Sequence, residues 1–157
     1  MLSVEYKSIF DTDCEAVVNP VNCYGISGAG LAAQFKRHFY YLDSVYVEAC
    51  SSKKLLVNDV LPVKNTGEQY PNIRYVIYFP TKNHWKEPAK YSYVDAGLRQ
   101  LEQTIKTLEI KSIALPMLGA GLGGLDPRII REYIYNFAFR VKDFCTVKLY
   151  IVGKNNV

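Results

Sequence analysis

The chain has 157 residues, of which 49% are hydrophobic and 22% charged, and its formal net charge is +4. This length and composition fit one globular domain with a core of its own, and they exclude a disordered or fibrous chain. No apolar run approaches the roughly 18 residues that a membrane span needs, and the first residues lack the layout of a signal peptide. We therefore expect a cytoplasmic protein without membrane contact.

The cysteines and histidines argue against a metal centre and against disulfides. Cys14, Cys23, Cys50 and Cys145 are scattered along the chain, and no pair has CxxC spacing. Only two histidines accompany them, so no cluster has the spacing of metal ligands. We expect reduced, largely buried thiols, no metal and no cofactor.

The first part of the chain predicts a strand, a loop and a helix in succession. Residues 2–10 alternate loosely and predict a first strand, while residues 16–19 predict a short buried strand because they are mostly apolar. This second strand delivers Asn19 and Asn22 to a loop that ends in glycines. Residues 31–39 then predict an amphipathic helix.

Further helices and strands alternate along the rest of the chain. A proline places one of these strands at the sheet edge, since proline cannot donate to a ladder, and β-branched and aromatic residues mark another as a central strand. The expected elements are a helix at 42–49, an edge strand at 60–64, a central strand at 75–79, the clearest helix at 91–110, a strand at 112–115, a helix at 127–140 and a final strand at 147–152.

A second glycine loop follows the strand at 112–115. Four glycines within residues 119–124 allow the backbone N–H groups to approach an anion closely, and Asp126 with Pro127 should begin a helix behind them. A phosphate or diphosphate is the natural guest, and a glycine-rich surface turn is the alternative. The stretch lacks the GKS/T of a P-loop and is not a clean dinucleotide fingerprint. Two such units on one parallel sheet would form the two walls of one crevice.

Three motifs in register resemble the macrodomain family. They are residues 16–23 with Gly28, Ala29 and Gly30, then residues 79–85, then residues 115–126. The middle motif most resembles the branch of DNA ADP-ribosyl hydrolases that serve as antitoxins to DNA-modifying ADP-ribosyltransferase toxins. The resemblance implies a single macrodomain over residues 1–157. Its expected fold is a three-layer α/β/α arrangement with a mixed, mostly parallel central sheet that binds ADP-ribose across the strand ends.

The resemblance also implies which residues hold the ligand. The first glycine loop would close over the distal ribose, and the second would cradle the diphosphate. The expected ligand contacts are Asn19, Asn22, Gly28, Ala29, Gly30, Thr81, Lys82, Leu118, Gly119, Ala120, Gly121, Leu122 and Gly123. For Asn19, capping of a turn is an equal alternative. Family members usually carry Gly-Asp after the first strand to recognise adenine, and here Ser8 or the backbone amide of Ile9 would take that part.

Lys82 and Asn22 are the expected catalytic residues. Lys82 follows a buried strand close to the apolar Trp85, so desolvation would lower the pKa of its amine. A neutral amine can attack C1 of an opened distal ribose, whereas an ammonium can steady the departing base or phosphate. Both roles stay open, as does that of a surface lysine on a turn. A related branch that acts on protein glutamate has an acidic residue where this chain has Gly123, so a Lys-plus-Asp mechanism is not supported, and Asp126 is expected to be a helix cap.

His84 and Trp85 are candidates for contact with DNA. Trp85 can stack on a base, or it can seal the strand end, and His84 can carry a proton or pack. Lysines and one arginine would form a basic face that neutralises DNA phosphates, or only a solvated rim. The members of this face would be Lys53, Lys54, Arg74, Lys82, Lys86 and Lys90.

The expected function is hydrolysis of the N-glycosidic bond between ADP-ribose and a DNA base, with modified single-stranded DNA as the partner. The resemblance places this activity in a bacterial or phage context, where it would neutralise a cognate toxin. One alternative is a hydrolase of ADP-ribose 1″-phosphate, or of acetylated or protein-linked ADP-ribose. Another is a reader that binds ADP-ribose without catalysis.

Overall fold

The computed structural model describes residues 2–152, so the predicted domain of residues 1–157 extends past them at both ends. Within this range the strands are β1 (Leu2–Glu5), β2 (Ala16–Val21), β3 (Leu61–Lys64), β4 (Tyr75–Pro80), β5 (Ser112–Leu115) and β6 (Thr146–Tyr150). The helices are α1 (Gly30–His38), α2 (Asp43–Ser51), α3 (Tyr91–Leu108) and α4 (Pro127–Val141). Two 3-10 turns, Ile9–Asp11 and Tyr40–Leu42, lie between these elements.

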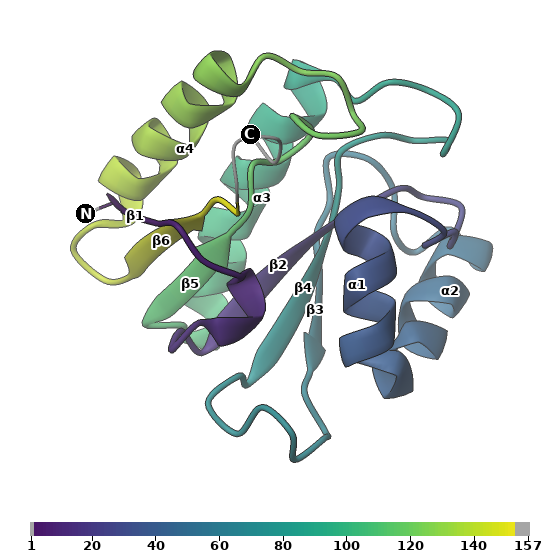
Figure 1. The fold of residues 1–157 in the computed structure, drawn as a ribbon, viewed down its shortest axis with the longest axis horizontal. Helices are drawn as coiled ribbons and strands as arrows, with labels where there is room; N and C mark the ends of the chain where they lie inside the picture. The colour runs from purple at the N-terminus through teal and green to yellow at the C-terminus, as the bar shows by residue number, and fades with distance from the viewer. Residues whose placement is uncertain (1, 153–157) are drawn as a thin grey trace.

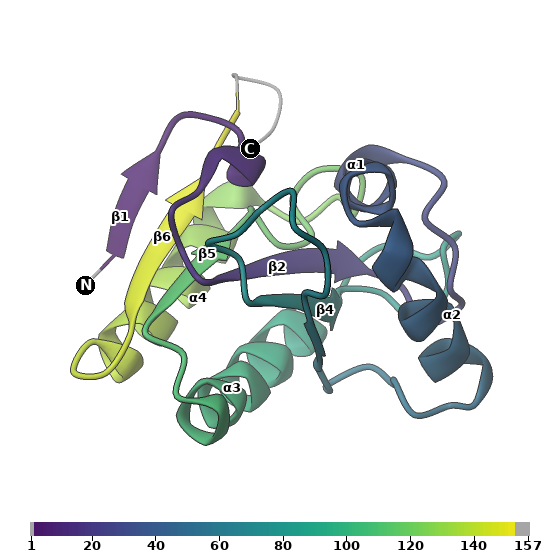
Figure 2. The ribbon, with the colours of Figure 1, turned by 90° about the horizontal axis from the view of Figure 1, so that it is seen from below.

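The strands form one sheet in the order β1-β6-β5-β2-β4-β3. Each neighbouring pair is parallel except β3 with β4, which is antiparallel. The prediction of a mixed, mostly parallel sheet is therefore confirmed, and β3 is the edge strand that Pro62 predicts. Parallel strands end at the same edge of a sheet, so the loops after β2, β4 and β5 leave it on one side. In Figure 2 the arrow of β2 points to that side, where α1 lies.

Helices cover both faces of the sheet, which confirms the three-layer arrangement (Figure 1). α3 and α4 bury Leu98 and Phe137 against one face, to which Ile77 of β4 contributes. α1 and α2 bury Phe35 against the other face, to which Val76 contributes. Neighbouring residues of β4 belong to different faces because successive side chains of a strand point in opposite directions.

The strand β2 runs through a proline, and this is where it departs from the prediction. The predicted strand ended at Asn19, but β2 continues to Val21, so Asn19 lies inside a strand and not in a loop. The carbonyl of Val21 accepts an N–H from Thr81 on the β4 side, so the backbone groups of the adjacent Pro20 face the β5 side. β5 pairs only with the first two residues of β2. The missing N–H of Pro20 therefore costs no ladder hydrogen bond.

The first strand is shorter than predicted. β1 ends at Glu5, and Ser8 instead caps the 3-10 turn, because its Oγ accepts an N–H from Phe10 at 3.2 Å. The final strand, β6, also stops two residues before the predicted end. The other predicted boundaries are confirmed to within two residues. Asp126 caps α4 as expected, with Pro127 at the first helical position.

Candidate active site

The loops after β2 and β4 stay joined by hydrogen bonds beyond the ends of the strands. The N–H of Thr81 donates to the carbonyl of Val21, and the N–H of Cys23 donates to the carbonyl of Asn83, each at 2.9 Å. These two bonds hold residues 21–23 alongside residues 81–83, so the backbone at Asn22 runs beside the backbone at Lys82. The two predicted catalytic residues are therefore brought together at one edge of the sheet, where Lys82 is half-buried.

Asn22 organises its own loop. Its Nδ2 donates to the carbonyl of Ile26 at 2.8 Å, and its Oδ1 accepts the N–H of Tyr24 at 2.9 Å. The hydroxyl of Tyr46, on α2, donates to the backbone carbonyl of Asn22 at 2.8 Å. Burial raises the pKa of Tyr46 far above its ordinary value, so the hydroxyl stays protonated and keeps donating. No local sequence pattern indicates this anchor, because it links residues 24 positions apart through the fold.

Asn19 has a buried acceptor that no described residue satisfies. Its side chain is 2% exposed, and its Oδ1 has no hydrogen-bond partner within residues 2–152. The alternative that Asn19 caps a turn is wrong, because the residue lies within β2. An unsatisfied buried acceptor costs about 1–3 kcal/mol, so a ligand or water that donates to Oδ1 would be favoured there.

Cys23, next to Asn22, is not a nucleophile. All four cysteines are free and buried, which confirms that part of the prediction. Burial raises the pKa of the Cys23 thiol to about 12, and burial also raises the pKa of Cys50 nearby. Because the thiolate is the reactive form, this burial makes both thiols poor nucleophiles.

The second glycine loop folds back on itself and leaves donors free. The N–H of Leu125 donates to the carbonyl of Gly119 at 2.9 Å, and Gly119 itself has a positive φ of 76° that favours glycine. The N–H groups of Gly119, Gly121, Leu122 and Gly123 meet no acceptor in the described part of the chain. A row of unpaired N–H groups can donate hydrogen bonds to an anion.

The two glycine loops meet, as the sequence predicts. Leu122 is 73% exposed, and its Cδ1 lies 2.9 Å from where a Cβ would stand on Gly30. Gly30 begins α1, and its predecessor Ala29 makes no side-chain capping bond, so the first N–H groups of this helix are also available to an anion. Gly28 is exposed, with open space where a Cβ would stand. The two loops are thus in contact, and both have N–H groups that meet no acceptor within the described residues.

Gly123 leaves no room for a side chain. A Cβ there would lie 2.5 Å from the carbonyl oxygen of Gly119 and 2.8 Å from the Cβ of Ala89. An acidic residue at this position would have to move the loop, which agrees with the expectation that a Lys-plus-Asp mechanism is not supported. Asp126 is engaged as the helix cap, and it accepts the N–H of Arg128 at 2.9 Å.

Ser8 and Ile9 lie at the same edge of the sheet, just after β1. The Oγ of Ser8 accepts the N–H of Phe10 and keeps its hydroxyl proton for another partner. The N–H of Ile9 meets no acceptor within the described residues. Recognition of adenine by either group stays a prediction.

Aromatic side chains extend the site beyond Lys82. His84 and Trp85 lie in the loop after β4, and the ring of Tyr24 meets that of His84 with centroids 4.5 Å apart. Tyr24 was missed in the sequence, although an exposed aromatic residue two positions after Asn22 is a signal that could have found it. The predicted basic face is wrong in one member, since Arg74 precedes β4 and Lys82 follows it, at opposite ends of the strand.

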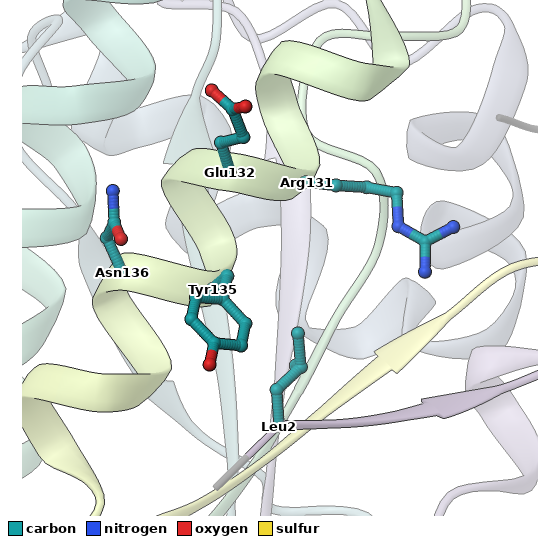
Figure 3. Close-up of a pocket in the computed structure, with 5 residues that line it drawn as sticks. All are labelled: Leu2, Arg131, Glu132, Tyr135 and Asn136. Carbon is teal, nitrogen blue, oxygen red and sulfur yellow. The ribbon is translucent and has the colours of Figure 1, made fainter.

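A hollow lies elsewhere and holds none of the predicted site residues. A cavity of about 440 Å³ lies between β1 and α4 (Figure 3). It is lined by Leu2, Arg131, Glu132, Tyr135 and Asn136. Over residues 2–152 no cluster of side chains could hold a metal ion, and no helix is both long and apolar enough to cross a bilayer.

Comparison with known proteins identifies the family. The Macro domain family model matches residues 18–134. The DNA ADP-ribosyl glycohydrolase of Mycobacterium tuberculosis is 41% identical over 126 residues, which are 80% of this chain and 35% of that protein. The chain thus spans about a third of the length of the curated relatives that it matches first.

Solved structures agree over nearly the whole chain. The macrodomain of Mycobacterium tuberculosis DarG has a TM-score of 0.89 and 34% identity, with 95% of this chain and 97% of that chain covered. Thermosipho africanus DarTG in complex with ADP-ribose has a TM-score of 0.90 and 28% identity, with 98% and 42% covered. The three-layer fold, the paired glycine loops and these similarities lead to one conclusion: the chain belongs to the Macro domain family.

Proposed function

We propose that this macrodomain binds ADP-ribose and hydrolyses the N-glycosidic bond that joins it to a base of DNA. The observation that carries the proposal is the set of hydrogen bonds that joins the β2 and β4 loops, because it brings the backbone at Asn22 and at Lys82 to the edge of the sheet where the glycine loops have unpaired N–H groups. The relatives named DNA ADP-ribosyl glycohydrolase support the choice of substrate.

The crevice would hold ADP-ribose through its backbone. The N–H groups of Gly119, Gly121, Leu122 and Gly123 would bind the diphosphate, together with the start of α1. In this arrangement the loop that Asn22 organises, from Asn22 to Gly30, would enclose the distal ribose. Adenine would lie at the other end of the ligand from the distal ribose, against Ser8 and Ile9.

Two polar side chains and one neighbouring stretch would complete the ligand contacts. The orphan Oδ1 of Asn19 would accept a hydroxyl proton from the ligand or from a bound water. Thr81 is buried next to Lys82, and its hydroxyl can donate or accept at the ribose. Leu118 and Ala120 would shape the diphosphate loop from its buried side.

Lys82 would carry the chemistry in one of two ways. In the first, its neutral amine adds to C1 of the opened distal ribose, the C1–N bond to the base breaks, and the base leaves with a proton. Water then releases ADP-ribose and restores the amine. In the second, the ammonium steadies charge on the departing base while water attacks C1. Reduction with borohydride separates them, because only the first forms an imine that can be trapped on Lys82.

The biological setting follows from the branch that the chain resembles. We propose that the protein acts in the cytoplasm, in a bacterial or phage context, and reverses the DNA modification made by a cognate ADP-ribosyltransferase toxin. The toxin would be its functional partner even without a lasting complex.

The test is release of ADP-ribose from single-stranded oligonucleotides modified on thymidine or guanosine. The native protein should release ADP-ribose from one of them, and Lys82→Ala should abolish release while ADP-ribose still binds in calorimetry. Lys64→Ala is the matched control and should keep full activity, because Lys64 is an exposed lysine of β3 that lies beside Tyr75, at the start of β4 and away from Lys82. No release from either oligonucleotide, with ADP-ribose bound, would refute the DNA substrate. Activity on ADP-ribose 1″-phosphate or on protein-linked ADP-ribose would then identify another hydrolase, and no turnover at all would identify a reader.

A further inference from the structure

Three aromatic rings, two of them exposed, form a row beside the candidate active site. The ring of Tyr24 meets that of His84 at 4.5 Å in an edge-to-face geometry, and the ring of His84 stacks on Trp85 with centroids 5.3 Å apart. Tyr24 is 55% exposed and Trp85 is 47% exposed. The row combines both loops, since Tyr24 follows β2 and the other two follow β4.

Hydrogen bonds fix the row relative to the catalytic residues. The side-chain Oδ1 of Asn22 accepts the N–H of Tyr24, and the N–H of Lys86 donates to Nδ1 of His84 at 3.0 Å. The neutral ring of His84 therefore carries its proton on Nε2. Tyr24 lies two residues from Asn22 along the chain, and His84 lies two residues from Lys82. The row of rings therefore begins next to the residues proposed to act in catalysis.

Cations accompany the rings. The Nζ of Lys86 lies 4.9 Å from the centroid of the Trp85 ring, and neither Lys86 nor Lys82 forms an ion pair with a carboxylate within residues 2–152. One carboxylate, that of Glu87, belongs to the same segment. Exposed aromatic faces with unpaired ammonium groups match the alternating bases and phosphates of a nucleic acid strand.

We infer that Tyr24, His84 and Trp85 form a stacking platform for the unmodified bases that flank the modified nucleotide. The inference rests on the proposed function and names the form of DNA that the site accepts, which is a single strand. A base that stacks on Trp85 takes the place of the Lys86 ammonium, which then pairs with the adjacent phosphate. Bases inside a duplex cannot reach the rings, because their faces are already stacked on one another.

The first experiment compares a modified nucleoside with the same nucleoside inside a single-stranded oligonucleotide and inside its duplex. The native protein should prefer the single strand. Tyr24→Ala or Trp85→Ala should lower the ratio of kcat/KM for the oligonucleotide to that for the nucleoside by roughly 5- to 150-fold, the loss of one stacked base. Trp85→Phe should recover most of the ratio. Tyr135→Ala, which removes an equally exposed ring on α4, is the control and should leave the ratio unchanged.

The second experiment separates failure of the platform from failure of the proposed function. Fluorescence anisotropy with an unmodified single-stranded oligonucleotide measures the platform alone, whether or not any substrate is turned over. Salt-dependent binding that Trp85→Ala weakens supports the inference. An unchanged oligonucleotide-to-nucleoside ratio in both alanine variants, or equal turnover of duplex and single strand, overturns it. A concentration-dependent dimer in sedimentation that Trp85→Ala abolishes, without oligonucleotide binding, also overturns it by making the row a protein interface.

Discussion

A methyl group at Gly123 should damage both the stability of the fold and the binding of ADP-ribose. In Gly123→Ala the new Cβ would lie 2.5 Å from the oxygen of Gly119 and 2.8 Å from the Cβ of Ala89. Real Cβ atoms do not approach other atoms this closely, so the loop must shift by several tenths of an ångström. Both close neighbours are constrained, since the Gly119 carbonyl accepts from Leu125 and the N–H of Ala89 donates to Gly123.

The size of the effect follows from these two constraints. Overpacking of a tight site costs about 1–3 kcal/mol, so the free energy of unfolding should fall by roughly that amount. The N–H groups of Gly119 and Gly123 flank the strained contact, and a hydrogen bond to a charged group contributes about 1.5–3 kcal/mol. Misplacement of one donor should therefore weaken ADP-ribose binding by roughly 10- to 150-fold.

Urea unfolding and titration calorimetry with ADP-ribose measure the two effects. The matched control is Gly121→Ala, because a Cβ at Gly121 meets nothing within 4 Å and its φ is not in the left-handed region. This variant keeps the N–H group and should bind ADP-ribose nearly as the native protein does. Native stability and affinity in Gly123→Ala, or an equal loss in both variants, would refute the steric argument and the assignment of this loop to the diphosphate.

Three further predictions concern groups that hold the site and the fold in place. Tyr46→Phe keeps the ring that stacks on Tyr78 at 5.0 Å but leaves the buried carbonyl of Asn22 without its donor, so the free energy of unfolding in urea should fall by about 1–3 kcal/mol. Burial opposes ionisation of Glu102, yet its hydrogen bonds to Arg140 at 2.9 Å and to Lys106 hold the pKa of the carboxyl below its ordinary value. This stability is present above the ordinary pKa and is lost as pH falls through the lowered one, so Glu102→Gln should flatten the acid limb of unfolding free energy against pH. Asp126→Ala should lower the urea midpoint by removing the cap of α4, whereas Asp126→Asn should keep it.

Each of these has a result that would count against it. For Tyr46, the exposed Tyr40→Phe is the control, and equal stability of the two variants would mean that the hydroxyl does not hold the Asn22 loop. For Glu102, an acid limb of native steepness in the Gln variant would assign the pH dependence to other carboxylates. For Asp126, equal midpoints for the Ala and Asn variants would show that the side-chain oxygen does not cap the helix.

The elements that the sequence predicted best carry strong local signals. The apolar stripe of α3 buries one continuous face, so its periodicity determines its type. β4 is buried on both faces, and its run of β-branched and aromatic residues identifies it as a strand. The start of α4 was equally clear. The start of a helix leaves N–H groups unpaired; the side chain of Asp126 accepts one of them, and Pro127 has no N–H group to pair.

The errors arose where long-range pairing outweighs a local signal. Pro20 indicates the end of a strand, but β2 continues through it. β5 pairs only with the first two residues of β2, so the missing N–H of Pro20 removes no hydrogen bond from the sheet. Ser8 reads as one more residue of an alternating strand, yet its hydroxyl turns the chain into a 3-10 turn. The anchor of Tyr46 on Asn22 and the contact of Tyr24 with His84 join separate elements, and no local pattern records them.

Under the proposed function, binding and chemistry would come from different parts of the chain, and the two can be separated. The unpaired N–H groups of the glycine loops depend on backbone geometry, so they tolerate any change that leaves the loop in place. Lys82 contributes one amine, and the backbone that carries it is held by the hydrogen bonds of Thr81 and Cys23. No substitution at residue 82 removes those bonds. Loss of the amine should therefore reduce turnover without a matching loss of ADP-ribose affinity. Gly123→Ala should instead reduce affinity, because the clash of its Cβ with the carbonyl of Gly119 moves the N–H donors themselves.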